Sequence, residues 1–314
     1  MSLAFIFPGQ GSQAVGMGAD LADAFGAARE VFQEVDEALG QKLFALMREG
    51  PEDQLTLTEN AQPALMAVSV AVMRVLEREF GVGVERAAFV AGHSLGEYSA
   101  LAAAGAISLS DTARLLKLRG QAMQRAVPVG QGAMASLIGP KTDLALAEEA
   151  AKAGSEAGVC VVANDNNQGN VVISGAKAAV DRAIEKAKEL GARAIPLNVS
   201  APFHCPLMQP AADEMAQALT AATIVTPKAP VVANVTARPT NDPEAIRRLL
   251  VEQVTGRVRW RESVQWMAGE GGVTRFAEAG AGKVLSGMVK RIAPDAEAVP
   301  LNAPADLEAF AKTF

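Results

Sequence analysis

The chain has 314 residues, of which 50% are hydrophobic and 20% are charged, and its formal net charge is −6. This length allows one large domain or two, and the composition is typical of a soluble globular enzyme. The acidic balance and the scattered basic residues argue against non-specific binding to nucleic acid.

Three features of the sequence bear on the compartment in which the protein works. The first apolar run, 3–7, follows no basic residues and stops at Pro8, so it is too short for a signal peptide. No uncharged apolar stretch approaches the length of a membrane span. The two cysteines, Cys160 and Cys205, lack metal-ligand spacing and are interpreted as reduced thiols. We therefore expect a cytoplasmic protein without a membrane partner or a metal site.

The first part of the chain is predicted to open with a strand and then to be largely helical. Its elements are, in chain order, a strand over 3–7, a glycine-rich loop over 8–18, a long helix over 65–80, a strand over 87–91 and further helices to about 127. Residues 127–132 are rich in proline and glycine and indicate a break in the structure.

The next segment has the element order β-α-β-β-α-β. Its elements are a strand over 133–138, a helix over 141–154, strands over 159–163 and 170–174 with a loop over 164–169 between them, a helix over 176–190 and a strand over 193–199. The second helix ends at Gly191, as expected for a C-terminal glycine cap. This order predicts a ferredoxin-like unit.

After this unit the chain is predicted to return to alternating helices and strands. The elements are a helix over 207–222, a strand over 231–235, helices over 243–253 and 260–270, a strand over 273–277, and a loop over 278–282 that opens a last helix. Strands that alternate with helices favour a parallel α/β sheet.

Ser94 lies in a G-x-S-x-G string between the predicted strand over 87–91 and an alanine-rich helix. This context is that of a nucleophile elbow, a tight turn that exposes the serine hydroxyl at a helix N-terminus. Free N–H groups and the helix dipole favour developing negative charge there. The string alone is weak evidence, since an ordinary strand–helix turn with an exposed serine would look the same. The flanking strand and helix favour the nucleophile.

A serine nucleophile needs a base, and the sequence has two histidines, His93 and His204. Adjacent residues at a tight turn point apart, so His93 is badly placed to take a proton from Ser94. His204 lies in a proline-flanked loop after the ferredoxin-like unit, at a junction where clefts form. The alternative is an ordinary loop histidine. No acidic third member is evident, but a backbone carbonyl can also hold a histidine ring.

Two further segments are candidates for the site. The glycine-rich loop over 7–13 lacks the lysine of a phosphate-binding loop. Its backbone around Gln10 is a candidate oxyanion donor that would complement the N–H of Leu95. The alternative is a plain strand–helix connection, which would have the same sequence features. Arg119 ends a predicted helical run, and most arginines in this position are solvated surface charges.

Seven segments, spread over nearly the whole chain, form an ordered series. They are FPGQGSQ at 7–13, TENAQPAL at 58–65, GHSLGEY at 92–98, LRGQAM at 118–123, NVVISG at 170–175, FHCPLM at 203–208 and AGAGKVLSGMVKRI at 279–292. In this series the chain resembles the bacterial malonyl-CoA:acyl-carrier-protein transacylases. Seven ordered segments are far more specific than the elbow string alone.

The resemblance implies an α/β fold with two parts. A hydrolase-like large subdomain with a parallel sheet would cover 1–128 and 199–314, and an inserted ferredoxin-like small subdomain would cover 129–198. The implied partners are malonyl-CoA and acyl carrier protein, and the implied oligomeric state is a monomer. No cofactor is implied, because CoA and phosphopantetheine are carried by the substrates.

The same resemblance implies roles for five residues. Ser94 would be acylated, and His204 would act as the general base. The backbone N–H groups of Gln10 and Leu95 would form the oxyanion hole, and Arg119 would bind the malonyl carboxylate. A guanidinium fits a carboxylate with two hydrogen bonds, whereas acetyl-CoA would leave a buried arginine unpaired.

Two more positions follow from the resemblance. A main-chain carbonyl orients the catalytic histidine in the family, and alignment of the segment 258–260 places this carbonyl on Arg259. Phe203 resembles a bulky residue that is associated with preference for malonyl over methylmalonyl groups. By its volume it would crowd a branched α-carbon.

The implied function is transfer of the malonyl group from malonyl-CoA to the phosphopantetheine thiol of acyl carrier protein, which supplies fatty-acid synthesis. The reaction would be ping-pong, through a malonyl-serine intermediate. One alternative is a serine esterase or thioesterase of the same fold, which would use water as the acceptor. Another is a non-catalytic carrier-protein binding subunit, which would be expected to lack the serine or the histidine.

Docking of an acidic carrier protein would require a local basic patch on this acidic chain. The candidates are Arg114, Lys117, Lys188, Lys290 and Arg291.

Overall fold

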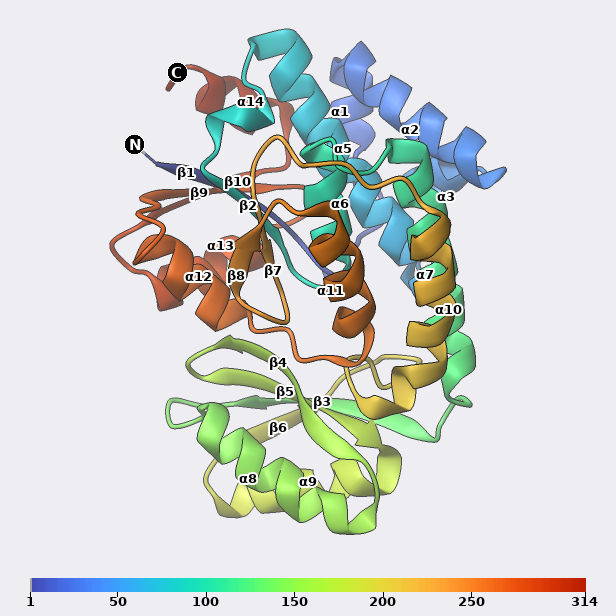
Figure 1. The fold of residues 1–314 in the computed structure, drawn as a ribbon, viewed down its shortest axis with the longest axis vertical. Coiled ribbons are helices and arrows are strands. Elements are labelled where there is room, and N and C mark those ends of the chain that lie inside the picture. The colour runs from blue at the N-terminus through green and yellow to red at the C-terminus, as the bar shows by residue number, and fades with distance from the viewer. Residues whose placement is uncertain (1) are drawn as a thin grey trace.

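Two β-sheets organise the computed structural model, which describes residues 2–314 (Figure 1). The larger sheet has the strand order β10-β9-β1-β2-β7-β8, and all neighbouring strands are parallel except β7 and β8. Its strands are β1 Leu3–Phe7, β2 Phe89–Gly92, β7 Val231–Ala233, β8 Arg238–Thr240, β9 Arg275–Ala279 and β10 Glu297–Leu301. The predicted α/β fold with a parallel large sheet is confirmed.

Helices cover both faces of this sheet. They are α1 Ala19–Ala24, α2 Gly26–Leu39, α3 Leu43–Glu49, α4 Glu52–Thr56, α5 Thr58–Phe80, α6 Leu95–Ala103, α7 Leu109–Ala126, α10 Gln209–Ala221, α11 Pro243–Thr255, α12 Trp260–Ala268, α13 Val284–Ile292 and α14 Pro304–Ala311, with short 3₁₀ turns η1 Val84–Arg86 and η3 Pro206–Met208. In residues 2–314, no helix combines the length and the apolar character needed to cross a membrane.

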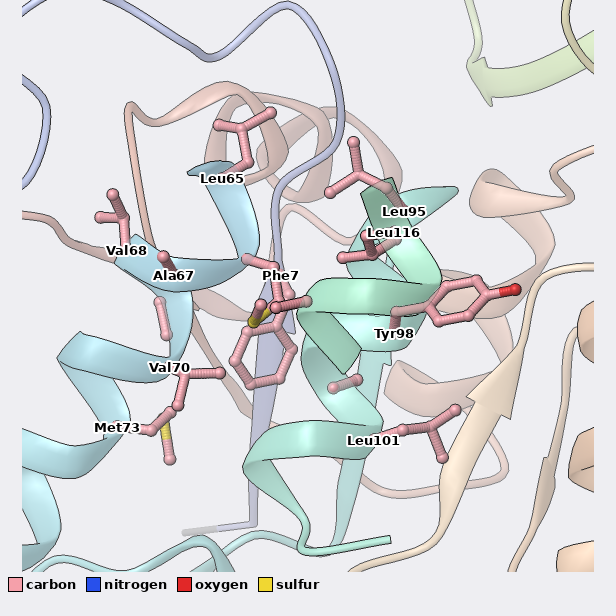
Figure 2. Close-up of a cluster of buried hydrophobic side chains, with 14 of the residues drawn as sticks. Phe7, Leu65, Ala67, Val68, Val70, Met73, Leu95, Tyr98, Leu101 and Leu116 are labelled. Atoms are coloured by element: carbon pink, nitrogen blue, oxygen red, sulfur yellow. The ribbon is translucent and has the colours of Figure 1, made fainter. Parts of the chain in front are cut away.

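Strand β1 shows why the first predicted strand is apolar at every position. Phe5 and Phe7 join the core that includes α5 and α6, while Ala4 and Ile6 join the core on the other face, with Trp260 of α12. A parallel strand buried on both faces needs apolar side chains throughout. Figure 2 shows Phe7 between side chains of α5 and of α6.

The smaller sheet has the strand order β4-β5-β3-β6, and its paired strands are antiparallel. Its elements are β3 Gly132–Ile138, α8 Leu144–Gly154, η2 Ser155–Ala157, β4 Cys160–Asn167, β5 Asn170–Ala176, α9 Lys177–Glu189 and β6 Arg193–Pro196. Helices α8 and α9 lie on the face remote from the large sheet (Figure 1). The element order and strand order are those of the predicted ferredoxin-like unit, with its own core.

Strand β4 connects the small unit to the large one through hydrogen bonds and an ion pair. Val258 donates its N–H to Ala163 O at 2.8 Å, and its carbonyl accepts from the N–H of Asp165 at 2.9 Å. The carboxylate of Asp165, which is 1% exposed, pairs with the guanidinium of Arg261 in α12 at 2.7 Å. This buried ion pair and the short backbone ladder fix the small sheet beside the elbow.

The structure departs from the predicted elements in three places. The segment 164–169, expected to be a loop, is mostly the end of β4, because its polar side chains bind partners on the large unit instead of solvent. Helix α5 begins at Thr58 instead of at the predicted residue 65, and it contains Pro63. Three C-terminal elements, β8, β10 and α14, were not predicted; β8 and β10 are edge strands, and each contains a proline.

Candidate active site

Ser94 lies at a sharp turn between β2 and α6. Its φ of 55° is in the left-handed region, which costs a residue other than glycine about 1–3 kcal/mol. Two hydrogen bonds hold the turn: the Ser94 N–H donates to Oδ1 of Asn234 at 2.8 Å, and Nε2 of Gln253 donates to Ser94 O at 3.0 Å. The strained turn places Ser94 in the wall of a cleft, at the N-terminus of α6.

Glycines allow the loop after β1 to pack against this turn. A Cβ atom on Gly96 would lie 2.3 Å from the carbonyl oxygen of Phe7, and one on Gly9 would lie 2.7 Å from that of His93. This close approach puts Gln10 and Leu95 in the wall of the same cleft. Within the described residues, neither of their backbone N–H groups donates to a protein acceptor. Two uncommitted N–H groups beside a nucleophile are what an oxyanion hole requires.

His204 meets Ser94 from the loop that precedes α10. Its Nε2 lies 2.7 Å from Ser94 Oγ, and its Nδ1 lies 2.9 Å from Gln253 O and 3.2 Å from Gly256 O. Because carbonyls can only accept, Nδ1 carries the proton and Nε2 presents its lone pair to the Ser94 hydroxyl. The φ of His204 is 57°, a second strained backbone position in the site.

Burial sets the charge of the His204 ring. The side chain is 3% exposed, and desolvation, aided by the charge of Arg119, lowers the pKa of His204 to about 3. The ring is therefore neutral near pH 7 and ready to accept a proton. His93, by contrast, points away from Ser94, and its Nε2 lies 2.9 Å from Oδ1 of Asn166 in the small sheet.

Arg119 of α7 is buried, with 2% of its surface exposed, and its guanidinium reaches the hydroxyl of Ser94. Nη1 donates to Gln62 Oε1 at 2.8 Å, and Nη2 donates to Gln253 Oε1 at 2.9 Å and to Ser94 Oγ at 3.2 Å. Its Nε has no partner, and no carboxylate within residues 2–314 forms an ion pair with it. A buried cation bound only by neutral groups is complementary to an anionic ligand.

The structure brings six of the seven sequence candidates into one cleft with a volume of about 260 Å³. They are Gln10, Ser94, Leu95, Arg119, Phe203 and His204. Phe203 is 8% exposed, precedes His204 in the chain and lines the same cleft.

The seventh candidate, Arg259, is not part of this arrangement. The carbonyls that hold His204 belong to Gln253 and Gly256 in and after α11, whereas the carbonyl of Arg259 accepts from the N–H and the hydroxyl of Ser263. Arg259 caps the start of α12, so its carbonyl is committed to the first turn of that helix. The assignment of the orienting carbonyl to Arg259 is therefore wrong.

Sequence reasoning missed the polar residues behind the site. Gln62 and Gln253 bind the guanidinium of Arg119, and Asn234 binds the backbone of the elbow. Gln62 lies inside the segment TENAQPAL, which contributed to the family resemblance, but no function was assigned to any residue of this segment. Gln253 and Asn234 lie far along the chain and carry no local pattern, so only the fold reveals them.

Comparisons with known proteins agree on one family. Residues 4–301 match a family model described as an acyl transferase domain. The chain is 47% identical over 307 residues to the malonyl CoA-acyl carrier protein transacylase of Escherichia coli K12, and the match covers 98% of this chain and 97% of that protein.

Solved structures give the same picture. An acyl-carrier-protein S-malonyltransferase from Bartonella henselae is 54% identical, with a TM-score of 0.96 and coverage of 100% of this chain and 99% of that one. A malonyl-transacylase solved in complex with its type II PKS acyl-carrier protein is 44% identical, with a TM-score of 0.96 and coverage of 100% of both chains.

Proposed function

This chain belongs to the malonyl-CoA:acyl carrier protein transacylase family and is an acyl-carrier-protein S-malonyltransferase, and we propose that it moves the malonyl group in two displacements at Ser94. The observation that carries this assignment of residues is the chain of contacts from Gln253 O through His204 to Ser94 Oγ, with Arg119 on the same oxygen. We propose further that the reaction supplies fatty-acid synthesis.

In the first displacement, Ser94 Oγ attacks the thioester carbonyl of malonyl-CoA while His204 Nε2 takes the hydroxyl proton. The carbonyl oxygen becomes an oxyanion that accepts hydrogen bonds from the N–H groups of Gln10 and Leu95. The intermediate then collapses, the C–S bond breaks, and His204 returns its proton to the departing CoA thiolate. The products are CoA and a malonyl ester on Ser94.

The second displacement reverses these roles with a different thiol. The phosphopantetheine thiol of acyl carrier protein gives its proton to His204 and attacks the Ser94 ester. The C–O bond breaks, Ser94 Oγ regains the proton from His204, and malonyl leaves as a thioester on the carrier. The carbonyl of Gln253 keeps the ring in the same tautomer in both steps.

Arg119 and Phe203 would select the acyl group. The malonyl carboxylate supplies the anionic partner that the buried guanidinium lacks, and an acetyl group cannot. The ring of Phe203 would crowd a methyl branch on the α-carbon. We assign the first residue to recognition of the carboxylate and the second to exclusion of branched groups.

The remaining proposals concern the whole chain. A hydrophobic core made only of residues from the small unit supports the division into 1–128 with 199–314 and 129–198. The free thiols of Cys160 and Cys205 fit a reducing compartment such as the cytoplasm. We also propose that the protein acts as a monomer, for which light scattering would give a molar mass near the 32.5 kDa of one chain.

The experiment that tests the function separates transfer from hydrolysis. Enzyme treated with malonyl-CoA is desalted and mixed with holo carrier protein, or with apo carrier protein that lacks the thiol as the matched control. We expect mass spectrometry to show one malonyl group on the holo carrier and none on the apo carrier. Release of free malonate with no labelled carrier would show a thioesterase instead, and no reaction in either arm would show a binding subunit.

A further inference from the structure

A buried polar chain behind the nucleophile ends on Arg119. Glu97, in the first turn of α6, is 2% exposed, and its Oε2 accepts from the N–H of Asn234 at 3.0 Å and from Nε2 of Gln253 at 2.9 Å. The other end of the Gln253 amide, Oε1, accepts from Nη2 of Arg119 at 2.9 Å. One amide thus links a buried carboxyl group to the buried guanidinium.

The partners of Gln253 permit only one orientation of its amide. Ser94 O and the carboxyl oxygen of Glu97 are acceptors on one side, and the guanidinium of Arg119 is a donor on the other. A reversed amide would set its oxygen against Ser94 O and the carboxyl oxygen of Glu97, and its N–H against the guanidinium of Arg119, so all three hydrogen bonds of the amide would be lost. Glu97 therefore helps to decide which end of the amide faces Arg119.

The guanidinium depends on this amide for its direction. Gln62 binds Nη1 and Gln253 binds Nη2, so one glutamine at each nitrogen fixes the plane of the group. Without the Gln253 oxygen, Nη2 would keep only the longer contact with Ser94 Oγ at 3.2 Å. A displacement of about 1 Å in a group that positions substrate is enough to lower a rate by about a hundredfold.

We propose that Glu97 is a positioning residue for Arg119, acting through the side-chain amide of Gln253, and that it helps to set the preference for acyl groups that carry a carboxylate. This inference rests on the proposed role of Arg119 in binding that carboxylate. Neither residue touches the substrate in this account. A neutral carboxyl or an amide at this position can make the same bond to Gln253, because each has a carbonyl oxygen that accepts from Nε2. Burial raises the pKa of Glu97 to about 7.

The test measures kcat/KM for acylation of Ser94 by malonyl-CoA and by acetyl-CoA, by rapid quench and intact mass. The variants are Glu97→Leu, Gln253→Leu, Glu97→Gln and Arg119→Ala. Gln253→Leu keeps the main-chain carbonyl that holds His204 but removes the amide that binds Arg119, Glu97 and Ser94 O. Glu97→Gln keeps an acceptor oxygen toward Gln253 and serves as the conservative control.

We expect Glu97→Leu to lose about tenfold or more with malonyl-CoA and to stay within about threefold with acetyl-CoA, because only the carboxylate needs a directed guanidinium. Gln253→Leu, which also removes the donor to Ser94 O, should lose activity with both substrates and lose more with malonyl-CoA. Glu97→Gln should keep the native ratio between the substrates. Equal losses with both substrates in Glu97→Leu would overturn the proposal, since they would show damage to the elbow. A collapsed ratio in Glu97→Gln would overturn the hydrogen-bond relay even if both leucine variants failed to fold.

Arg119→Ala keeps this test separate from the proposed function. If that variant loses the preference for malonyl-CoA while the leucine variants keep it, Arg119 binds the carboxylate and the relay does not position it. If Arg119→Ala keeps the preference for malonyl-CoA over acetyl-CoA, the proposed role of Arg119 is wrong. The proposed positioning role of Glu97, which depends on it, is then wrong as well.

Discussion

At the scale of single residues, the site depends on where each proton lies before the reaction begins. The carbonyls of Gln253 and Gly256 hold the proton of His204 on Nδ1, which leaves Nε2 free to accept from Ser94. Burial beside the cationic Arg119 keeps this ring neutral. A histidine and a serine are then sufficient for proton transfer, without a carboxylate on the ring.

The pH dependence of acylation should reflect this burial. The pKa of His204 is lowered to about 3 from the 6.5 of a free histidine, so the base becomes protonated only in strongly acidic solution. We expect the rate of Ser94 acylation to stay level as the pH falls from 8 to 5. The rate is measured at each pH by stopped flow in the Glu97→Gln variant. This variant is used because Glu97, whose pKa is about 7, would otherwise titrate in the same range. A midpoint between pH 6 and 7 would contradict a desolvated base.

The residues that sequence reasoning found and those it missed differ in a physical way. Ser94 and His204 carry chemistry that few residue types perform, and the chain has two histidines to choose from. Gln253 and Asn234 contribute through where their side-chain amides lie in the fold. The sequence alone does not distinguish them from the other asparagines and glutamines of the chain. The orienting carbonyl was placed on Arg259 for the same reason, because a backbone group has no signature in the sequence.

At the scale of elements, the site is made by the close approach of two loops. The strand β1 ends at Phe7 and β2 ends at Gly92, next to each other in the parallel sheet, so their C-terminal loops meet at one edge. Gly96 lets α6 start against the loop after β1. This contact sets the spacing between the N–H groups of Gln10 and Leu95.

Gly96→Ala should therefore damage both stability and activity. The new Cβ would lie 2.3 Å from the carbonyl oxygen of Phe7, so one of the two loops must move. We expect a loss of about 1–3 kcal/mol in the free energy of unfolding, measured in urea, and loss of malonylation in the folded protein. The matched control is Gly287→Ala in α13, where a Cβ has no atom within 4 Å and should raise stability by about 0.5–1 kcal/mol. Similar effects of the two changes would refute this reading of the elbow.

The predicted elements agree best with the structure where the sequence has a strong apolar periodicity. They disagree where contacts with distant residues, and not a local pattern, determine the secondary structure. The order of the ferredoxin-like unit follows from alternating β-branched strands and amphipathic helices. The end of β4 was taken for a loop because asparagine and aspartate are rare in strands. Its polar residues are stable there only because His93 and Arg261 bind them from the large unit. No local pattern contains that information.

At the scale of the whole molecule, one buried ion pair joins the two sheets. Asp165 in β4 is 1% exposed and is paired with Arg261 of α12, while Val258 forms backbone hydrogen bonds to the same strand. Asn166, next in the strand, contacts His93 beside the nucleophile. The position of the small unit over the cleft is therefore tied to the elbow.

Removing the cation from this pair should be strongly destabilising. Arg261→Ala leaves the carboxylate of Asp165 buried and unpaired, and we expect a loss of about 3 kcal/mol in the free energy of unfolding. Arg48→Ala is the control, since Arg48 and Asp23 are exposed and their pair contributes about 0.2–1 kcal/mol. Urea unfolding of both variants gives the comparison. Equal losses would mean that the interface does not depend on the buried pair.

Every step proposed for this site requires that Ser94 carries the malonyl group, which can be examined by intact-mass spectrometry with peptide mapping after brief exposure to malonyl-CoA. We expect a gain of one malonyl group, located on the peptide that contains Ser94 and absent from Ser94→Ala. An adduct that persists in Ser94→Ala, or that maps to another residue, would contradict it.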